Sequence, residues 1–143
     1  MKADAATEAA VTTVLNKLAE GYAKRDLAGI LSLLAPDRDA VMFGTGADEK
    51  RIGLAEIKAQ AERDWSQSEA TSLTYGWTSV SAAGSVAWVA ADLTFDVKAG
   101  GEELSFPGRL TMVLEKRGEQ WLIVQSHFSL PAPSQEEGES FPT

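Results

Sequence analysis

The chain has 143 residues, a length typical of one compact domain. Its 13 Lys and Arg residues against 21 Asp and Glu residues give a formal net charge of −8, which disfavours binding to nucleic acid. The absence of cysteine excludes disulfides and thiolate metal ligands, and the single histidine, His127, excludes a zinc site built on several imidazoles. We therefore expect no nucleic-acid partner, no metal and no cofactor.

Three helices are predicted in the N-terminal half of the chain. In each of them apolar residues recur at helical spacing; Asp26 stands where an N-cap of the second helix would be, and Pro36 ends that helix. A short apolar strand is predicted between the second and third helices. The predicted ranges are 7–24, 27–34 and 54–67 for the helices and 40–43 for the strand.

After Ser68 the pattern changes to long strands rich in β-branched and aromatic residues, predicted at 73–81, 86–97, 103–116 and 120–130. The breaks between them are short and contain glycine, which predicts hairpins and an antiparallel meander. The order of elements predicts an α+β domain over residues 1–131, with helices on one side of the sheet. The Pro- and Glu-rich residues 132–143 are predicted to form a flexible tail.

The predicted compartment and oligomeric state follow from the apolar pattern. No run reaches the roughly 18–20 apolar residues of a membrane helix, and the N-terminus lacks the apolar core of a signal peptide, so we expect a cytoplasmic protein with no membrane partner. In the last predicted strand, Trp121 and Ile123 alternate with Leu122, Val124 and Phe128. Both faces are thus apolar, which predicts a homodimer packed through the sheet.

Three stretches of the sequence resemble a known family. They are residues 22–37, residues 53–57, and residues 109–131, the last of which closes with the pattern Trp121…His127-Phe-Ser129-Leu-Pro131. The chain resembles the SnoaL-like branch of the nuclear transport factor 2-like superfamily, and it is similar to small bacterial members found in polyketide and enediyne biosynthesis. The resemblance implies a cone-shaped, curved antiparallel sheet packed on three N-terminal helices.

The resemblance also indicates which chemistry is absent. Related steroid isomerases use a tyrosine in the first helix, a carboxylate base near the first strand and a protonated aspartate on a later strand. The matching positions here are Leu18, Gly44 and Leu110. Since neither a base nor an oxyanion donor occupies these positions, we do not expect that mechanism.

The same resemblance implies that the even-numbered strand residues line the cone. The predicted pocket residues are Tyr22, Phe43, Trp65, Trp88, Asp92, Leu110, Met112, Val124, Ser126 and Phe128. Trp77 and Trp121 are assigned to packing. An aromatic and mostly apolar lining suits a planar or polyene-like hydrophobic ligand.

Two residues are candidates for catalysis. Asp92 lies between apolar strand neighbours, where burial would raise its pKa, although a solvent-facing position is the alternative. His127 is predicted to face away from the cone, towards a dimer contact. If the strand register differs by one residue, His127 would join Ser129 and Arg109 at the polar end of the pocket.

Two functions remain open at this level. The first is a binding protein for hydrophobic or aromatic small molecules, acting as an accessory or cyclase-like protein in bacterial secondary metabolism. The second is a non-catalytic structural or assembly dimer whose cone is filled with side chains. Fold membership does not decide between them, nor whether any reaction occurs.

Overall fold

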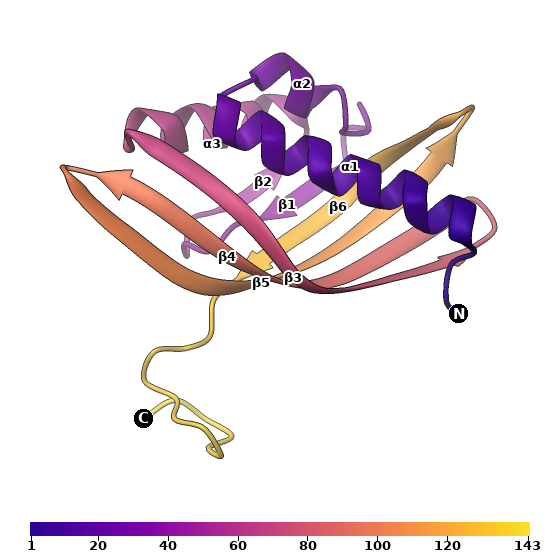
Figure 1. Cartoon of the computed structure of the whole chain (residues 1–143). Helices are drawn as coiled ribbons and strands as arrows, with labels where there is room; N and C mark the ends of the chain where they lie inside the picture. The colour runs from indigo at the N-terminus through magenta and orange to yellow at the C-terminus, as the bar shows by residue number, and fades with distance from the viewer.

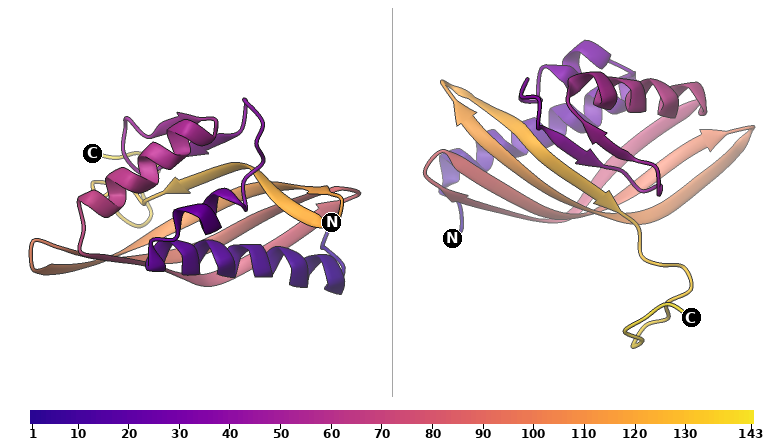
Figure 2. Two further views of the ribbon diagram at one scale, coloured as in Figure 1. Left: turned by 90° about the horizontal axis from the view of Figure 1, so that it is seen from above. Right: turned by 180° about the vertical axis from the view of Figure 1, so that it is seen from behind.

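All 143 residues are described by the computed structural model, in which three helices lie on one side of a curved sheet (Figure 1). The elements are α1 (Ala5–Lys24), α2 (Leu27–Leu31), β1 (Val41–Phe43), β2 (Lys50–Ile52), α3 (Leu54–Ser66), β3 (Ala70–Ala83), β4 (Val86–Ala99), β5 (Glu102–Arg117) and β6 (Gln120–Ser129). The predicted α+β fold class is confirmed. Beyond Ser129 the chain leaves the sheet and hangs below it (Figures 1 and 2).

The six strands form one mixed sheet in the order β2-β1-β6-β5-β4-β3. The four long strands are antiparallel, as predicted, but β1 runs parallel to β6, so a purely antiparallel sheet is wrong. Strand β2 was not predicted, because the three residues Lys50–Ile52 include two charges and are too short to show alternation. Together β1 and β2 extend the sheet beneath α3.

Helix α1 is fixed at both ends by side chains. The Asp4 carboxylate accepts a hydrogen bond from the backbone N–H of Thr7 at 2.7 Å, so the helix begins at Ala5, earlier than predicted. At the other end Arg25 adopts a left-handed conformation. Its guanidinium donates to the backbone oxygens of Trp65 at 2.7 Å and Ser68 at 2.9 Å. These bonds fix the C-terminal end of α1 against that of α3.

Which residues of a strand point toward the core depends on the hairpin turn that joins it to its neighbour. The two-residue turn Gly100–Gly101 pairs Ala91 with Leu110, so odd residues of β4 share a face with even residues of β5. Leu110, Met112 and Leu114 point inward, as predicted. The inward residues of β4 are Ala87, Val89, Ala91 and Leu93, not the predicted even set. That prediction assumed that even-numbered residues face inward in both β4 and β5, whereas the turn between the strands places odd residues of β4 beside even residues of β5.

A β-bulge at Val124 reverses the face of β6 halfway along the strand. Val113 pairs with Gln125, but Leu114 pairs with Ile123, which leaves Val124 without a partner. Before the bulge Trp121 and Ile123 point into the core; after it Ser126 is the buried residue. The prediction that Trp121 and Ile123 face outward is therefore wrong. Because of the bulge, Trp121 and Ile123 before it and Ser126 after it all lie on the inner face of the sheet.

The structure also bears on membranes and metals. Even α1, the longest of the three helices, lacks the apolar stretch that a bilayer-spanning helix needs, and so do the other two. No three His, Asp or Glu side chains gather in an arrangement that could hold a metal ion. A candidate site lies in the hollow between the helices and the sheet.

Candidate functional site

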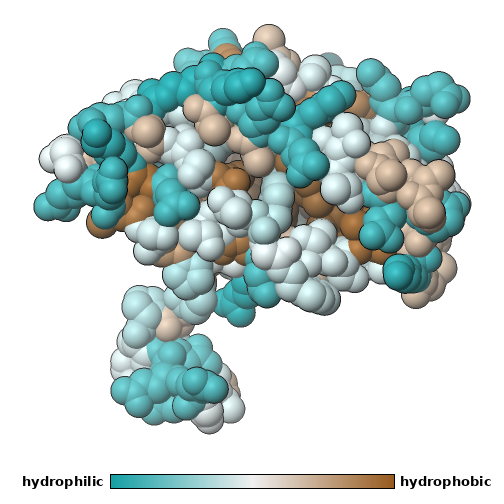
Figure 3. Space-filling model, viewed as in Figure 1, coloured by the Kyte–Doolittle hydropathy of each residue, from teal (hydrophilic) through white to brown (hydrophobic).

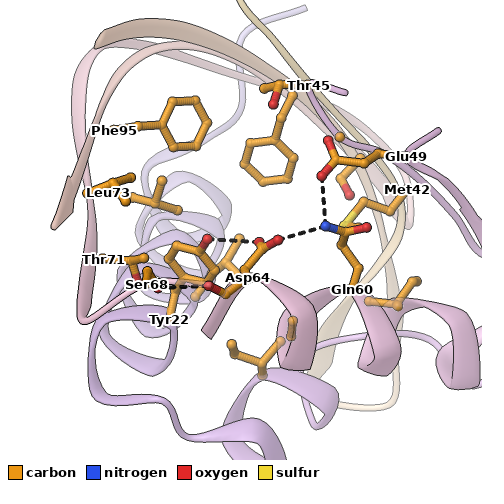
Figure 4. A pocket seen from close by; sticks show the side chains of 18 of the residues that line it. Tyr22, Met42, Thr45, Glu49, Gln60, Asp64, Ser68, Thr71, Leu73 and Phe95 are labelled. Carbon is orange, nitrogen blue, oxygen red and sulfur yellow. Dashed lines mark hydrogen bonds between the residues drawn. The ribbon is translucent and has the colours of Figure 1, made fainter. Parts of the chain in front are cut away.

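A cavity of about 310 Å³ lies between the inner face of the sheet and the C-terminal halves of α1 and α3 (Figure 4). Most of its lining is hydrophobic. The main apolar residues are Leu18, Ile57, Leu73, Phe95, Val97, Phe106, Met112, Ile123 and Phe128. In the space-filling view, hydrophobic residues show between the hydrophilic helices and the sheet (Figure 3). The volume is at the lower end of the range for small-molecule sites.

One end of the cavity is polar. The Tyr22 phenol donates a hydrogen bond to Asp64 Oδ2 at 2.8 Å. The buried Gln60 amide donates to Asp64 Oδ1 and to Glu49 Oε1, both at 2.7 Å (Figure 4). Its oxygen accepts a bond from Arg51 Nε at 2.9 Å, which fixes the orientation of the amide. Both amide hydrogens are therefore used to hold two carboxylates at the cavity wall.

Burial shifts the acid–base properties of this end. It raises the pKa of Asp64 above the ordinary aspartate value, against the lowering effect of the hydrogen bonds from Tyr22 and Gln60. Burial also raises the pKa of Tyr22, and the nearby Asp64 carboxylate raises it further. Tyr22 thus keeps its proton, while Asp64 is easier to protonate than an exposed aspartate.

The loop between β1 and β2 forms one side of the cavity through Gly44, Thr45 and Glu49. Arg63 of α3 holds this loop by donating to Glu49 Oε1 at 3.0 Å and to Asp48 Oδ2 at 2.7 Å. These hydrogen bonds, the one to Asp48 above all, raise the pKa of the guanidinium. Arg63 therefore ties the loop to the helix that carries Asp64.

Four of the predicted pocket residues line the cavity, namely Tyr22, Met112, Ser126 and Phe128. Leu110 is buried in the adjoining core but does not line the cavity. Trp65 lies behind the wall: its ring centroid is 6.2 Å from that of Tyr22, and its Nε1 donates to the Tyr22 backbone oxygen at 3.1 Å. Trp65 supports the cavity wall through Tyr22.

The other predicted pocket residues lie outside the cavity. Trp88 and Asp92 are exposed on the outer face of β4, where Asp92 stands opposite Arg109 of β5. Phe43 is exposed, and Val124 is the bulge residue. The turn before β5 accounts for the positions of Trp88 and Asp92, and the bulge in β6 accounts for that of Val124. The proton-transfer role predicted for Asp92 has no support, because its carboxylate is neither buried nor in the cavity.

His127 faces away from the cavity, as its primary interpretation predicted. It is exposed, and its ring centroid lies 5.1 Å from that of Phe43 on the neighbouring strand. Arg109 is exposed as well, and Ser129 pairs with it across β5 and β6. The alternative polar end built from these three residues is therefore wrong.

The sequence interpretation missed the polar residues that do line the cavity, Glu49, Gln60, Asp64 and Thr71. A signal was present in α3. Ile57, Gln60, Ala61 and Asp64 follow the i, i+3, i+4, i+7 spacing of one helix face. Polar residues inside a buried helical stripe require hydrogen-bond partners, and so mark a polar wall.

The architecture defines the chain as a nuclear transport factor 2-like fold. A superfamily protein from Salmonella enterica serovar Typhimurium superposes with a TM-score of 0.85 at 19% identity, covering 97% of this chain and 100% of that one. A protein of unknown function from Pseudomonas putida gives 0.75 at 21% identity, covering 96% and 94%. A protein from Novosphingobium aromaticivorans, provisionally named scytalone dehydratase, gives 0.79 at 12% identity, covering 89% and 85%.

Residues 11–133 match the family model of the SnoaL-like domain. The chain therefore belongs to the SnoaL-like family, which confirms the family resemblance. Among curated proteins, none matches this sequence. The structural relatives above share less than a quarter of their residues with this chain, so they show its fold and leave its activity to be argued from its own site.

Proposed function

We propose that this protein binds a compact hydrophobic small molecule in the cavity between α1, α3 and the sheet. The observation that carries the proposal is an apolar cavity of about 310 Å³ with the hydrogen-bonded Tyr22–Asp64 pair at one end. An apolar body with a few convergent polar groups is the usual composition of a ligand site. The volume favours a ligand of one or two rings over an extended polyene.

Binding can be tested with naphthalene as the probe. The Trp65 indole N–H donates to the backbone of Tyr22, so its NMR signal reports on the cavity wall. Titration with naphthalene should shift this signal. The signal is assigned by its absence from the spectrum of Trp65→Phe. Ala61→Leu should weaken binding at least tenfold, because Ala61 lines the cavity.

Ala59→Leu is the matched control, since Ala59 is exposed on the same helix. It makes the same change in side chain without reaching the cavity, so it should leave the affinity for naphthalene unchanged. If the Trp65 signal does not move at saturating naphthalene, or if both leucine variants bind equally well, the proposed site is wrong.

A second candidate function is proton transfer at the polar end, favoured by the half-buried Asp64 carboxyl with its raised pKa. A ketone such as 2-tetralone would test it. The Asp64 carboxylate would take a proton from the carbon next to the carbonyl, the C–H electron pair would form a C=C bond, and the C=O π pair would move to the oxygen. The enolate would then take a deuteron from the D2O solvent at the same carbon, which restores the ketone. Deuterium incorporation followed by NMR should exceed the uncatalysed rate and be lost in Asp64→Asn. Equal incorporation with the variant would remove Asp64 from this role.

The homodimer predicted from the sequence also remains a proposal. On the outer surface Trp77, Trp88 and Phe43 are exposed, which supports an apolar contact there. The alternative of a cone filled with side chains is at odds with the observed cavity. Light scattering should give twice the chain mass, and Trp88→Lys should give one chain mass. A wild-type monomer at micromolar concentration would contradict the dimer.

A role in bacterial secondary metabolism stays a prediction that rests on family resemblance alone. The gene neighbourhood would test it, because biosynthetic enzymes beside the gene would identify the class of intermediate. A neighbourhood without such enzymes would remove the reason for this assignment.

A further inference from the structure

Thr71, at the start of β3, lines the cavity beside Tyr22 (Figure 4). Its side chain is 7% exposed, and its hydroxyl is the only buried side-chain polar atom in the chain without a hydrogen-bond partner. The hydroxyl lies near enough to the Tyr22 phenol to offset slightly the rise in pKa that burial causes there, yet no hydrogen bond of ordinary geometry joins the two. A buried hydroxyl without a partner costs free energy, and such exceptions call for an explanation.

The free hydrogen-bonding capacity around Thr71 can be counted group by group. The Tyr22 proton is given to Asp64, so the phenol oxygen can only accept. Both Gln60 amide hydrogens are given to Glu49 and Asp64. Among the buried side-chain atoms at this end, the Thr71 hydroxyl is therefore the one left without a partner, and the Tyr22 oxygen beside it is a free acceptor.

We propose that Thr71 and Tyr22 form a subsite for a neutral hydroxyl group, so that the ligand of this cavity is a phenol or alcohol on a compact apolar body. One hydroxyl can accept from Thr71 and donate to the Tyr22 oxygen. The bond from Tyr22 to Asp64 would then continue the chain, and bonds in series strengthen one another. This inference rests on the proposed function, since it names the chemistry of a ligand for the same cavity.

A charged group fits this end of the cavity less well than a neutral hydroxyl. An ionised carboxylate would enter next to Asp64 and Glu49, and Thr71 offers it a single free donor. An ammonium group has donors only, so it could not itself accept the free Thr71 proton. It would also lose its hydration in a mostly apolar cavity. A neutral hydroxyl is the group that matches one donor beside one acceptor.

The test compares the affinities of naphthalene, 2-naphthol, 2-naphthoate and 2-(aminomethyl)naphthalene by calorimetry at neutral pH. We expect 2-naphthol to bind roughly 3–10-fold more tightly than naphthalene, as one well-made pair of hydrogen bonds predicts. The charged analogues should bind more weakly than 2-naphthol. A carboxylate or an amine that binds more tightly than 2-naphthol would overturn the hydroxyl subsite.

Variants of Thr71 separate the hydroxyl from the shape of the wall. Thr71→Val keeps the shape and should remove the preference for 2-naphthol, with the naphthalene affinity unchanged within about twofold. Thr71→Ser keeps the hydroxyl and should keep the preference. Thr74→Val is the control, because Thr74 is exposed on the same strand and outside the cavity lining.

The outcomes distinguish this inference from the proposed function. If none of the four compounds binds, the cavity proposal fails and the inference fails with it. If naphthalene binds and 2-naphthol binds no better, the cavity proposal stands and the hydroxyl subsite is wrong. The hydroxyl subsite is equally wrong if Thr71→Val keeps the full preference for 2-naphthol.

Discussion

The inner face of the sheet has two halves built from the same strands. In the packed half, Val89 and Leu114 belong to the same core as Val11 and Leu15 of α1, and all four are essentially fully buried. In the open half, Leu73, Phe95, Phe106 and Phe128 line the cavity and are only partly buried. Helix α1 covers the first half along its length, whereas its last turns meet α3 and leave space over the second (Figure 1).

The difference shows how one layer can serve two purposes. The packed half supplies most of the buried apolar area, and each fully buried aliphatic side chain there contributes about 1.5–3 kcal/mol. The apolar side chains of the open half are less buried. The polar groups beside them are held in fixed positions by hydrogen bonds to one another. Stability and ligand binding should therefore respond to different substitutions.

The largest expected effect is on the free energy of unfolding. Leu114→Ala in the packed half should cost about 3–4 kcal/mol, because a fully buried leucine leaves a cavity behind. Leu73→Ala in the open half should cost less than roughly 1.5 kcal/mol, since Leu73 already borders a void. Urea unfolding measures both values. Equal losses would mean that the two halves are equally packed.

Gly108→Ala should disturb both properties. A Cβ at Gly108 would lie 2.5 Å from Cε2 of Phe95, a ring that lines the cavity. The ring must move, so we expect a loss of about 1–3 kcal/mol in stability, together with weaker naphthalene binding. Gly76→Ala is the control, because its Cβ would meet the Asp92 Cβ at an ordinary 3.6 Å. Unchanged naphthalene affinity in Gly108→Ala would show that Phe95 moves away from the cavity.

Titration should distinguish the carboxyl of Asp64, whose pKa burial raises, from the carboxyl of Asp37, whose pKa Arg117 lowers. Carbon NMR should place the pKa of Asp64 above the ordinary aspartate value, because of burial, and Tyr22→Phe should raise it further by removing a hydrogen bond. The pKa of Asp37 should lie below that value, because Arg117 donates to it. If the pKa of Asp64, like that of Asp37, lay below the ordinary aspartate value, the burial of Asp64 would be contradicted.

The direction of the shift at Asp64 sets the pH dependence of stability. A raised pKa in the folded state means that the contribution of this group is fully present below the unfolded-state pKa and is lost as the pH rises through the folded-state value. The stability of the wild type relative to Asp64→Asn should therefore increase as the pH falls through this window. A relative decrease would reverse the assigned direction.

The smallest expected effect is local. Arg63→Gln removes the ion pairs from α3 to Asp48 and Glu49, and partly exposed pairs of this kind contribute little to global stability. Hydrogen exchange at the Gly46 amide, which donates to Glu49, should speed up. Lys58→Gln is the control, because Lys58 pairs with Glu62 on the solvent side of α3. Equal exchange in the two variants would show that Arg63 does not hold the loop.

Much of the fold could be predicted from the sequence, because its strongest signals are local. The helical stripe of α1, the Asp26 cap and the glycine-containing hairpins depend on neighbouring residues, and the structure contains each of them. The parallel pairing of β1 with β6 joins segments that are far apart in the chain, so no short-range pattern indicates it. Family resemblance provided the overall shape.

The site was harder to predict because it depends on which face each strand presents. One reversal at the turn before β5 placed Trp88 and Asp92 on the outer face, and the bulge at Val124 affected β6 in the same way. The apolar walls at Met112 and Phe128 followed from alternation alone. The Tyr22–Asp64 bond joins two helices, and it depends on the Arg25 contacts that hold them together.

The bulge at Val124 divides one strand into two independently adjustable segments. Trp121 before it is buried in the core and Ile123 both belongs to the core and borders the cavity, whereas Ser126 and Phe128 after it line the cavity. Substitutions after the bulge can reshape the ligand site while the earlier segment keeps its core contacts. Deleting Val124 would restore regular pairing with Ile123 still opposite Leu114 and Gln125 still opposite Val113, so both segments would keep their inward faces.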